Sequence, residues 1–307
     1  MKFVITGPTG SIGVNLIIRL LNDPDNEIWA VCNPLSGKYK LLPINERLHT
    51  ILCDMHKLPE ISDKLPASID VFIHLAWSGT VGAARNDMNL QLENIRCCID
   101  AIDIAKKHNC KTYVGAGSQA EYGRKSTPIT EDIICNPENG YGAAKLSANH
   151  MSNILCREYG MRLLWLRFFS VYGPYENFTS LTSSTIIKYL TGEVPDFTEG
   201  IQLWDYSYAE DVAEAVTALI NNNDCSGIYN ISTGKARALK DYIAIIAEQC
   251  NAASVGNLGA IPYSPASVMY LCGNISKLET DTGCTMSTPF ELGISRMIDW
   301  IKEIKNL

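Results

Sequence analysis

The sequence predicts an α/β fold with a doubly wound parallel sheet and a second, smaller α/β domain. Short apolar runs alternate with amphipathic stretches through the first half of the chain, as successive βαβ units require. Residues 71–75 are apolar on both faces, which is typical of a buried parallel strand. A glycine turn, residues 7–13, stands directly between the first apolar run and the first amphipathic stretch.

The expected elements follow in order along the chain. Strands are predicted at residues 3–5, 28–32, 49–53, 71–75, 112–115, 163–169 and 228–231. The first helix carries the apolar stripe Ile12, Leu16 and Leu20, and further helices are predicted at about 85–107, 141–159 and 211–220. The alternation breaks after Gly173-Pro174. We therefore expect residues 1–172 and about 206–232 to form the sheet domain, and 173–205 and 233–307 to form the smaller domain.

Composition excludes several classes of protein. The 307 residues are 46% hydrophobic and 19% charged, unlike a disordered chain. The net charge of −7 argues against a surface for nucleic acid. No run approaches the roughly 18 apolar residues of a membrane span, and the N-terminus is unlike a signal peptide. The 11 cysteines lack metal-ligand spacing, so we expect free thiols, no metal site and a cytoplasmic protein.

The glycine turn indicates a site for a dinucleotide. Gly7 and Gly10 allow a tight turn and the close approach of a pyrophosphate, and Gly13 allows the helix to pack closely on the strand. Ser11 and Ile12 begin that helix, whose free N–H groups and dipole attract phosphate. The turn thus predicts NAD or NADP binding.

The end of the second strand bears on the choice of cofactor. An acidic residue at this position binds the adenosine ribose of NAD, but this chain has Asn33 between Cys32 and Pro34. The chain therefore lacks the carboxylate that would repel the 2′-phosphate of NADP, and Lys38 or Lys40 could supply positive charge for it. No arginine stands at the tip, so NADP is only slightly preferred over NAD.

Three side chains form a candidate catalytic group. Tyr141 and Lys145 are four residues apart on a predicted helix and share one face. The ammonium is expected to lower the pKa of the phenol, so that Tyr141 exchanges a proton with an alcohol or ketone. Ser118 follows the strand at 112–115, at the sheet edge where ligands bind, and would orient the substrate oxygen.

Together these motifs resemble the extended short-chain dehydrogenase/reductases, specifically the NAD(P)-dependent epimerase/dehydratase family that acts on nucleotide sugars. The resemblance covers nearly the whole chain. It is carried by residues 7–13, 54–55, 74–76, Asn94, 118–123, 141–145, 166–169, 171–174, 205–213 and 229–231. It implies a Rossmann fold, a nucleotide-sugar substrate and a homodimer formed through the helix bearing Tyr141 and the long helix before it.

The resemblance also implies individual roles. Asp54 and Met55 would contact the adenine, Leu75, Ala76 and Trp77 would line the middle of the cofactor, and Phe168 would flank the nicotinamide, with Asn94 as the structural asparagine of the long helix. The substrate-binding positions would be Ser78, Ser118, Gln119, Ser170 and Trp204. The alternatives are that Asp54 caps a loop, that His74 is a buried strand histidine and that Phe168 is plain core.

Departures from the family's pattern reduce the number of reactions that the chain could catalyse. Dehydratases of the family carry an acid pair where this chain has Gln119 and Ala120, and neither an amide nor a methyl group performs acid–base chemistry. Two reactions remain, of which reduction of a nucleotide 4-keto-6-deoxysugar is preferred to 4-epimerisation with bound NAD. A non-catalytic NAD(P)-binding sensor or scaffold is a third alternative. Glu121 either faces the sugar or forms a structural ion pair.

The predicted substrate half departs as well. Ser170 stands where epimerases usually have a phosphate-binding asparagine, and Trp204 replaces an arginine that commonly clamps the pyrophosphate. The identity of the nucleotide is therefore left open.

Overall fold

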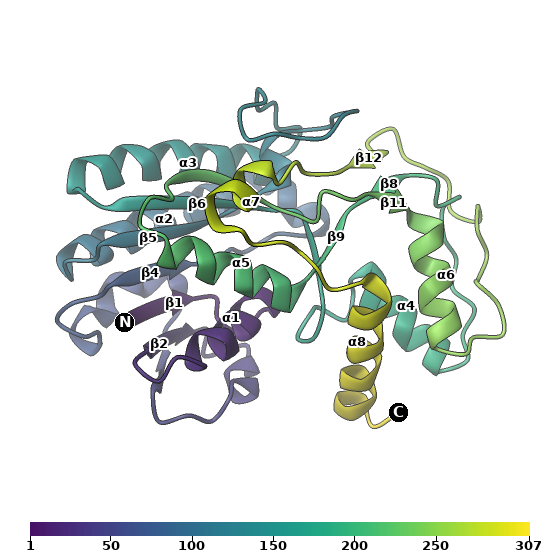
Figure 1. The fold of residues 1–307 in the computed structure, drawn as a ribbon, viewed down its shortest axis with the longest axis horizontal. Coiled ribbons are helices and arrows are strands. Elements are labelled where there is room, and N and C mark those ends of the chain that lie inside the picture. The colour runs from purple at the N-terminus through teal and green to yellow at the C-terminus, as the bar shows by residue number, and fades with distance from the viewer.

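The computed structural model describes residues 1–307 and is built on a parallel sheet of seven strands (Figure 1). The spatial order is β10-β6-β5-β4-β1-β2-β3, and every neighbouring pair is parallel. The strands are β1 (Lys2–Thr6), β2 (Glu27–Cys32), β3 (Leu48–Leu52), β4 (Val71–His74), β5 (Thr112–Ser118), β6 (Arg162–Phe168) and β10 (Gly227–Ile231). The predicted α/β fold with a parallel, doubly wound sheet is confirmed.

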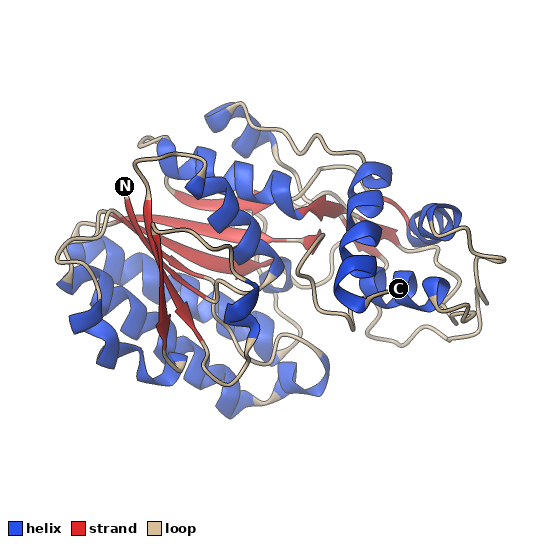
Figure 2. Ribbon diagram, turned by 90° about the horizontal axis from the view of Figure 1, so that it is seen from below, coloured by secondary structure: helices blue, strands red, loops and turns tan.

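Helices cover both faces of this sheet, as Figure 2 shows from below. α2 (Met88–Lys107) and α3 (Gly140–Tyr159) bury one face, and α1 (Ser11–Leu21) and α5 (Ala209–Asn221) bury the other. The helix predicted from residue 85 begins at Met88, because the Asp87 carboxylate accepts a hydrogen bond from the Leu90 N–H and caps the first turn. Residues Gly82–Asn86 form a separate 3-10 turn.

A smaller layer lies beyond the carboxyl ends of the strands (Figure 1). It contains α4 (Leu181–Leu190), α6 (Leu239–Gln249), α8 (Phe290–Lys305) and a small sheet of β8 (Leu203–Trp204), β11 (Arg237–Ala238) and β12 (Tyr270–Leu271). These helices share a separate apolar core. β7 (Ser170–Tyr172) pairs in parallel with β9 (Tyr206–Tyr208) where the chain passes between the two layers.

One segment of the predicted smaller domain packs on the large sheet instead. α7 (Ser276–Thr282) contacts α5 and β10, and Ile275, Leu278 and Met286 join the core on that face of the sheet. Burial of these apolar side chains against α5 draws the segment back to the sheet. The division into two domains stays a prediction.

Short 3-10 helices follow several strand ends. They are Lys38–Leu41, Met55–Lys64 and Gln119–Glu121. All 11 cysteines are free thiols. No helix combines the length and the apolar character that a membrane crossing demands.

Candidate active site

The glycine turn has the shape that a pyrophosphate needs. Gly7 has a φ of +67°, and a Cβ there would lie 2.6 Å from the Ala76 nitrogen. A Cβ on Gly13 would lie 2.7 Å from the backbone of Pro8. A Cβ on Gly10 would meet no atom within 4 Å, and no side chain caps the start of α1. The space beside Gly10 at the start of α1 is therefore open, where the free N–H groups of a first helical turn favour a phosphate.

The next two residues of the turn anchor it to its surroundings. The Ser11 hydroxyl donates a 2.8 Å hydrogen bond to the Pro174 carbonyl, so the turn is tied to the segment that follows β7. Ile12 packs against the apolar core between α1 and the sheet. Ser11 can thus offer its backbone N–H to a phosphate while its side chain fixes the turn.

Asn33, Asp54 and Met55 all follow strands at the carboxyl edge of the sheet. Asn33 is exposed and its Oδ1 accepts a hydrogen bond from the Leu35 N–H at 2.9 Å. Asp54 caps the following 3-10 helix by accepting from the His56 N–H at 3.0 Å, the alternative that the sequence left open. The Met55 sulfur lies 3.8 Å from the Ser78 hydroxyl.

The end of β4 is held against β1. The Leu75 N–H donates to the Thr6 carbonyl at 3.1 Å and the Ala76 N–H to the Thr6 hydroxyl at 3.4 Å. The Thr6 hydroxyl also lies 2.8 Å from the His74 Nδ1. Burial lowers the pKa of His74 to about 3, so its imidazole is neutral.

Asn94 connects α2 to the loop after β4. Its side-chain oxygen accepts from the Ser78 N–H at 2.9 Å, and its amide nitrogen donates to the Ser78 carbonyl at 2.9 Å. The neighbouring Gln91 accepts a 2.9 Å hydrogen bond from the Trp77 indole N–H. The predicted structural role of Asn94 therefore has a physical basis, since one fully buried amide satisfies both backbone groups of Ser78.

Ser118, Tyr141 and Lys145 come together at the carboxyl edge of the sheet. Ser118 is the last residue of β5 rather than a residue beyond it. Tyr141 and Lys145 lie near the start of α3, where the Asn139 side chain caps the helix by accepting from the Gly142 N–H at 2.9 Å. The Ser118 side chain lies beside the Tyr141 phenol and acts to lower its pKa. The predicted group is thus assembled in space.

Lys145 contacts different neighbours from those the sequence suggests. Its Nζ donates a 2.6 Å hydrogen bond to the Ala116 carbonyl and lies 3.6 Å from the centre of the Trp77 ring. The same nitrogen is 5.8 Å from the centre of the Tyr141 ring. Burial lowers the pKa of Lys145 to about 7.

The predicted lowering of the Tyr141 pKa is wrong for this structure. Burial raises the pKa of the phenol, against the opposing effects of the Ser118 side chain and the positive charge of Arg85. The Arg85 guanidinium lies 4.6 Å from the centre of the Tyr141 ring. The sequence analysis missed Arg85 because no motif marks it, and it comes before α2 in a turn whose position only the fold sets.

The predicted substrate residues separate into two places. Gln119 lines a cavity of about 270 Å³ together with Arg85, Arg124, Ala120 and Asn139. Ser170 and Trp204 lie elsewhere and contact each other, with the indole N–H donating to the serine hydroxyl at 2.7 Å. Ser170 and Trp204, which both depart from the family's pattern, therefore form a hydrogen bond with each other. Phe168 belongs to the apolar core, the alternative that the sequence left open.

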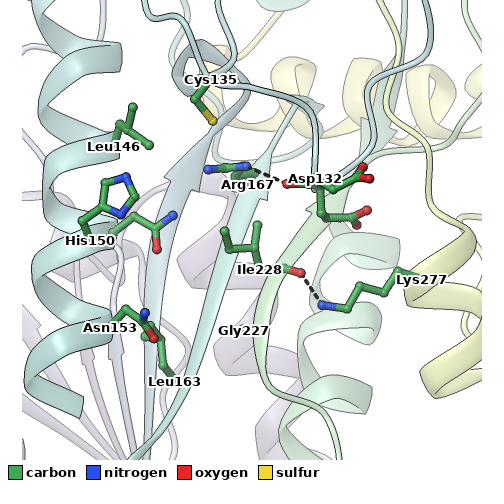
Figure 3. Close-up of a pocket in the computed structure, with 12 residues that line it drawn as sticks. Asp132, Cys135, Leu146, His150, Asn153, Leu163, Arg167, Gly227, Ile228 and Lys277 are labelled. Atoms are coloured by element: carbon green, nitrogen blue, oxygen red, sulfur yellow. Dashed lines mark hydrogen bonds between the residues drawn. The ribbon is translucent and has the colours of Figure 1, made fainter. Parts of the chain in front are cut away.

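A second cavity lies away from this group of residues. It has a volume of about 660 Å³ and lies between α3, β6 and the edge strand β10 (Figure 3). Its lining includes His150 of α3, Arg167 of β6 and Lys277 of α7, but neither Ser118 nor Tyr141. We therefore place the candidate active site by the three side chains and the glycine turn, not by cavity size.

The chain is similar in sequence to known proteins. A sequence model of the NAD dependent epimerase/dehydratase family matches residues 3–232. The chain is 26% identical to the uncharacterized UDP-glucose epimerase YtcB of Bacillus subtilis, over 80% of this chain and 81% of that one. It is 24% identical to a UDP-glucose 4-epimerase of Corynebacterium glutamicum, over 81% of this chain and 80% of the relative.

Solved structures share the fold over the whole chain. The UDP-glucuronic acid 4-epimerase of Bacillus cereus, in complex with UDP-glucuronic acid and NAD, has a TM-score of 0.87 and 23% identity. That match covers 99% of this chain and 100% of the other. The UDP-glucose 4-epimerase of Thermotoga maritima with UDP-glucose has a TM-score of 0.89 and 20% identity, with the same coverage.

Proposed function

The chain belongs to the NAD dependent epimerase/dehydratase family, and on that premise we propose that it epimerises C4 of a nucleotide-linked sugar. The proposal rests on the grouping of Ser118, Tyr141 and Lys145 beside Gln119 and Ala120. Hydride transfer at the sugar carbon and proton transfer at its oxygen need only the first three side chains and the cofactor. Dehydration needs an acid–base pair that Gln119 and Ala120 cannot supply. The relatives named above as 4-epimerases favour the same reaction.

Each catalytic side chain has a defined task in this proposal. NAD, when bound, would supply reversible hydride transfer at the sugar carbon, and the keto sugar would turn over between the two transfers so that the hydride returns to its opposite face. Tyr141 takes the proton of the sugar hydroxyl and later gives it back, while Ser118 holds the sugar oxygen by a hydrogen bond. The Ser118 side chain and the Arg85 charge stabilise the phenolate that forms. Lys145, held by Ala116 and Trp77, contributes its ammonium beside the cofactor.

The cofactor is proposed to lie across the carboxyl edge of the sheet. The pyrophosphate would contact the first turn of α1, where the open space at Gly10 admits it. Asp54 and Met55 would contact the adenine, and residues 75–77 the middle of the dinucleotide. NAD is the cofactor that an epimerase retains. The nucleotide sugar would reach Gln119 on one side and the Trp204–Ser170 pair on the other.

Reduction of a nucleotide 4-keto sugar is the second candidate. Burial raises the pKa of Tyr141, so the phenol is protonated at neutral pH and ready to donate to a ketone oxygen. Asn33 provides no carboxylate at the predicted adenosine ribose, which would permit NADP and exchange of the cofactor between turnovers.

A panel assay with the purified protein distinguishes these reactions. UDP-glucose, UDP-N-acetylglucosamine and UDP-glucuronic acid are incubated with NAD, and sugar epimers are separated by chromatography. A nucleotide 4-keto-6-deoxysugar is incubated with NADH or NADPH, and loss of reduced-nicotinamide absorbance is followed. Epimers without net cofactor change support the first proposal, and stoichiometric oxidation supports the second. NAD binding without any turnover would indicate a sensor or scaffold.

The Tyr141→Phe variant tests the acid–base assignment in the same assay. It retains the ring and lacks the hydroxyl, so turnover should fall by a factor of about 10² or more while the affinity for NAD stays close to that of the wild type. Near-normal turnover would show that another group transfers the proton.

We also propose that the protein forms a homodimer through α2 and α3. Their outer surface exposes Met88, Leu92, Met151 and Ile154, each more than 40% accessible to solvent. A groove between the helices is lined in part by small residues, including Gly140 and Ala143. Exposed apolar side chains of this kind are typical of an interface between subunits.

A further inference from the structure

A buried carboxylate lies directly behind Ser118. Glu121 is 0% exposed, and its Oε1 accepts hydrogen bonds from the Ser118 N–H at 2.8 Å and the Trp165 indole N–H at 3.0 Å. Its Oε2 accepts from the Arg167 Nε at 2.7 Å. Three donors from the neighbouring strands β5 and β6 thus converge on one carboxylate. This geometry favours the structural ion pair over a role facing the sugar, because the carboxylate is fully buried and paired with Arg167.

The contacts on Ser118 leave its hydroxyl proton free. The Ser118 side-chain oxygen accepts from the Ala120 N–H at 3.2 Å, and Glu121 accepts from the Ser118 backbone. These reciprocal bonds form a capping box that fixes both the backbone and the hydroxyl oxygen of Ser118. A serine hydroxyl has one proton, which remains available for a substrate oxygen or for Tyr141.

Arg167 balances the charge of Glu121. Its side chain is 2% exposed, and its guanidinium also lies 4.3 Å from the centre of the Tyr122 ring. Figure 3 shows the guanidinium at the edge of the second cavity, where Nη1 contacts the Glu131 carbonyl at 3.5 Å. A buried carboxylate is tolerated only when it is paired and its oxygens accept hydrogen bonds.

Gly117 makes room for this arrangement. A Cβ at that position would lie 2.4 Å from the Trp165 indole nitrogen and 2.7 Å from the Glu121 Oε1. Any side chain at 117 would therefore separate the indole from the carboxylate. The strand end, the indole and the carboxylate form one closely packed unit.

We propose that Glu121 is a positioning residue that holds Ser118 in its catalytic geometry through the Ser118 N–H, with Arg167 as its buried counter-charge. The inference rests on the proposed function, because Ser118 must touch the substrate for its placement to matter. Glu121 itself touches no reacting atom. A shift of Ser118 of about 1 Å is enough to reduce the rate of such a reaction by a factor of about 10².

Two double variants separate the hydrogen bond from the charge. Glu121→Gln with Arg167→Gln keeps an oxygen facing the Ser118 N–H and pairs the two new amides with each other. Glu121→Leu with Arg167→Leu also removes both charges, but it leaves the Ser118 N–H without an acceptor. Replacing both members of a buried ion pair by apolar side chains often preserves the fold, so both proteins can be assayed.

The proposal predicts different kinetics for these two proteins. The glutamine pair should retain kcat within about threefold, whereas the leucine pair should lose about 10- to 100-fold in kcat with little change in KM. Because the Ser118 side chain lowers the pKa of Tyr141, the leucine pair should also shift the pH dependence of kcat to higher pH. Equal kcat values and identical pH profiles for the two pairs would overturn the proposal.

A control at the other end of β5 identifies effects of stability alone. The Ser62 hydroxyl and the His108 Nε2 form a buried 2.9 Å hydrogen bond near the start of that strand. Ser62→Ala should lower Tm without moving the pH profile of kcat. Should it move the profile as the leucine pair does, the kinetic change would reflect stability, and the positioning role would be refuted.

Ser118→Ala separates failure of this inference from failure of the proposed function. If Ser118→Ala retains wild-type turnover, the proposed site is wrong. If Ser118→Ala loses turnover while the leucine pair has the kcat and pH profile of the wild type, the proposed function is supported and only the positioning role of Glu121 is refuted.

Discussion

Asn94 ties α2 to the loop after β4, and replacing it by alanine removes both hydrogen bonds to Ser78. Each of these bonds contributes about 1–1.5 kcal/mol, and the backbone groups left behind are partly buried. We therefore expect Asn94→Ala to lower the free energy of unfolding by about 2–4 kcal/mol. For a chain of this size that corresponds to a decrease in Tm of about 4–8 °C.

The loss should also reach the proposed cofactor site, because Trp77 and Ser78 continue the segment that includes Leu75 and Ala76. Isothermal titration with NAD should show a Kd at least about tenfold higher for Asn94→Ala, equivalent to about 1.4 kcal/mol. Asn26→Ala is a matched control. That buried amide bonds the Leu20 carbonyl at 2.9 Å and the N-terminal amine at 3.1 Å, close to the start of β2.

Asn26→Ala should lower stability by a similar amount and leave the NAD affinity unchanged. A wild-type urea midpoint for Asn94→Ala would refute the energetic reasoning. Equal NAD affinities for the two variants would refute the link between Asn94 and the cofactor site.

Three further predictions concern other parts of the molecule. Gly10→Val should keep Tm within about 2 °C, since its side chain meets open space, but should raise the Kd for NAD at least about tenfold in titration calorimetry. Burial raises the pKa of Glu176 to about 7. The stability that the protonated carboxyl contributes is therefore fully present below about pH 4.5 and is lost as the pH rises through 7. Glu176→Gln should therefore raise Tm at pH 8 but not at pH 4.5, and equal changes at both would refute this reasoning. Leu92→Asp should yield monomers in light scattering, whereas Ile44→Asp, at a fully exposed site, should not alter the mass.

Local patterns predicted the sheet well, and the reason is physical. A parallel strand buried on both faces is mostly apolar, so residues 71–75 and 163–169 stand out in the sequence. The starts of helices were harder to place. Arg85 was assigned to the long helix because its turn carries no obvious stop signal, whereas the Asp87 cap sets the boundary at Met88.

The return of α7 to the large sheet shows the limit of such patterns. Residues 276–282 are too short to display a clear apolar period, and their partners on α5 are about 60 residues earlier in the chain. Only the packing of Leu278 into the sheet core places them there. The loss of the strand–helix alternation in the sequence therefore predicts that all of residues 233–307 belong to the smaller domain.

By itself, the sequence determined the parallel sheet, the glycine turn and the helical spacing of Tyr141 and Lys145, because each depends on residues close together in the chain. Tertiary structure decided what surrounds those residues. It placed Arg85 over the phenol, Trp77 beneath the ammonium and a buried ion pair behind Ser118. These contacts set the protonation of the site through distance and burial, and neither quantity is contained in local spacing.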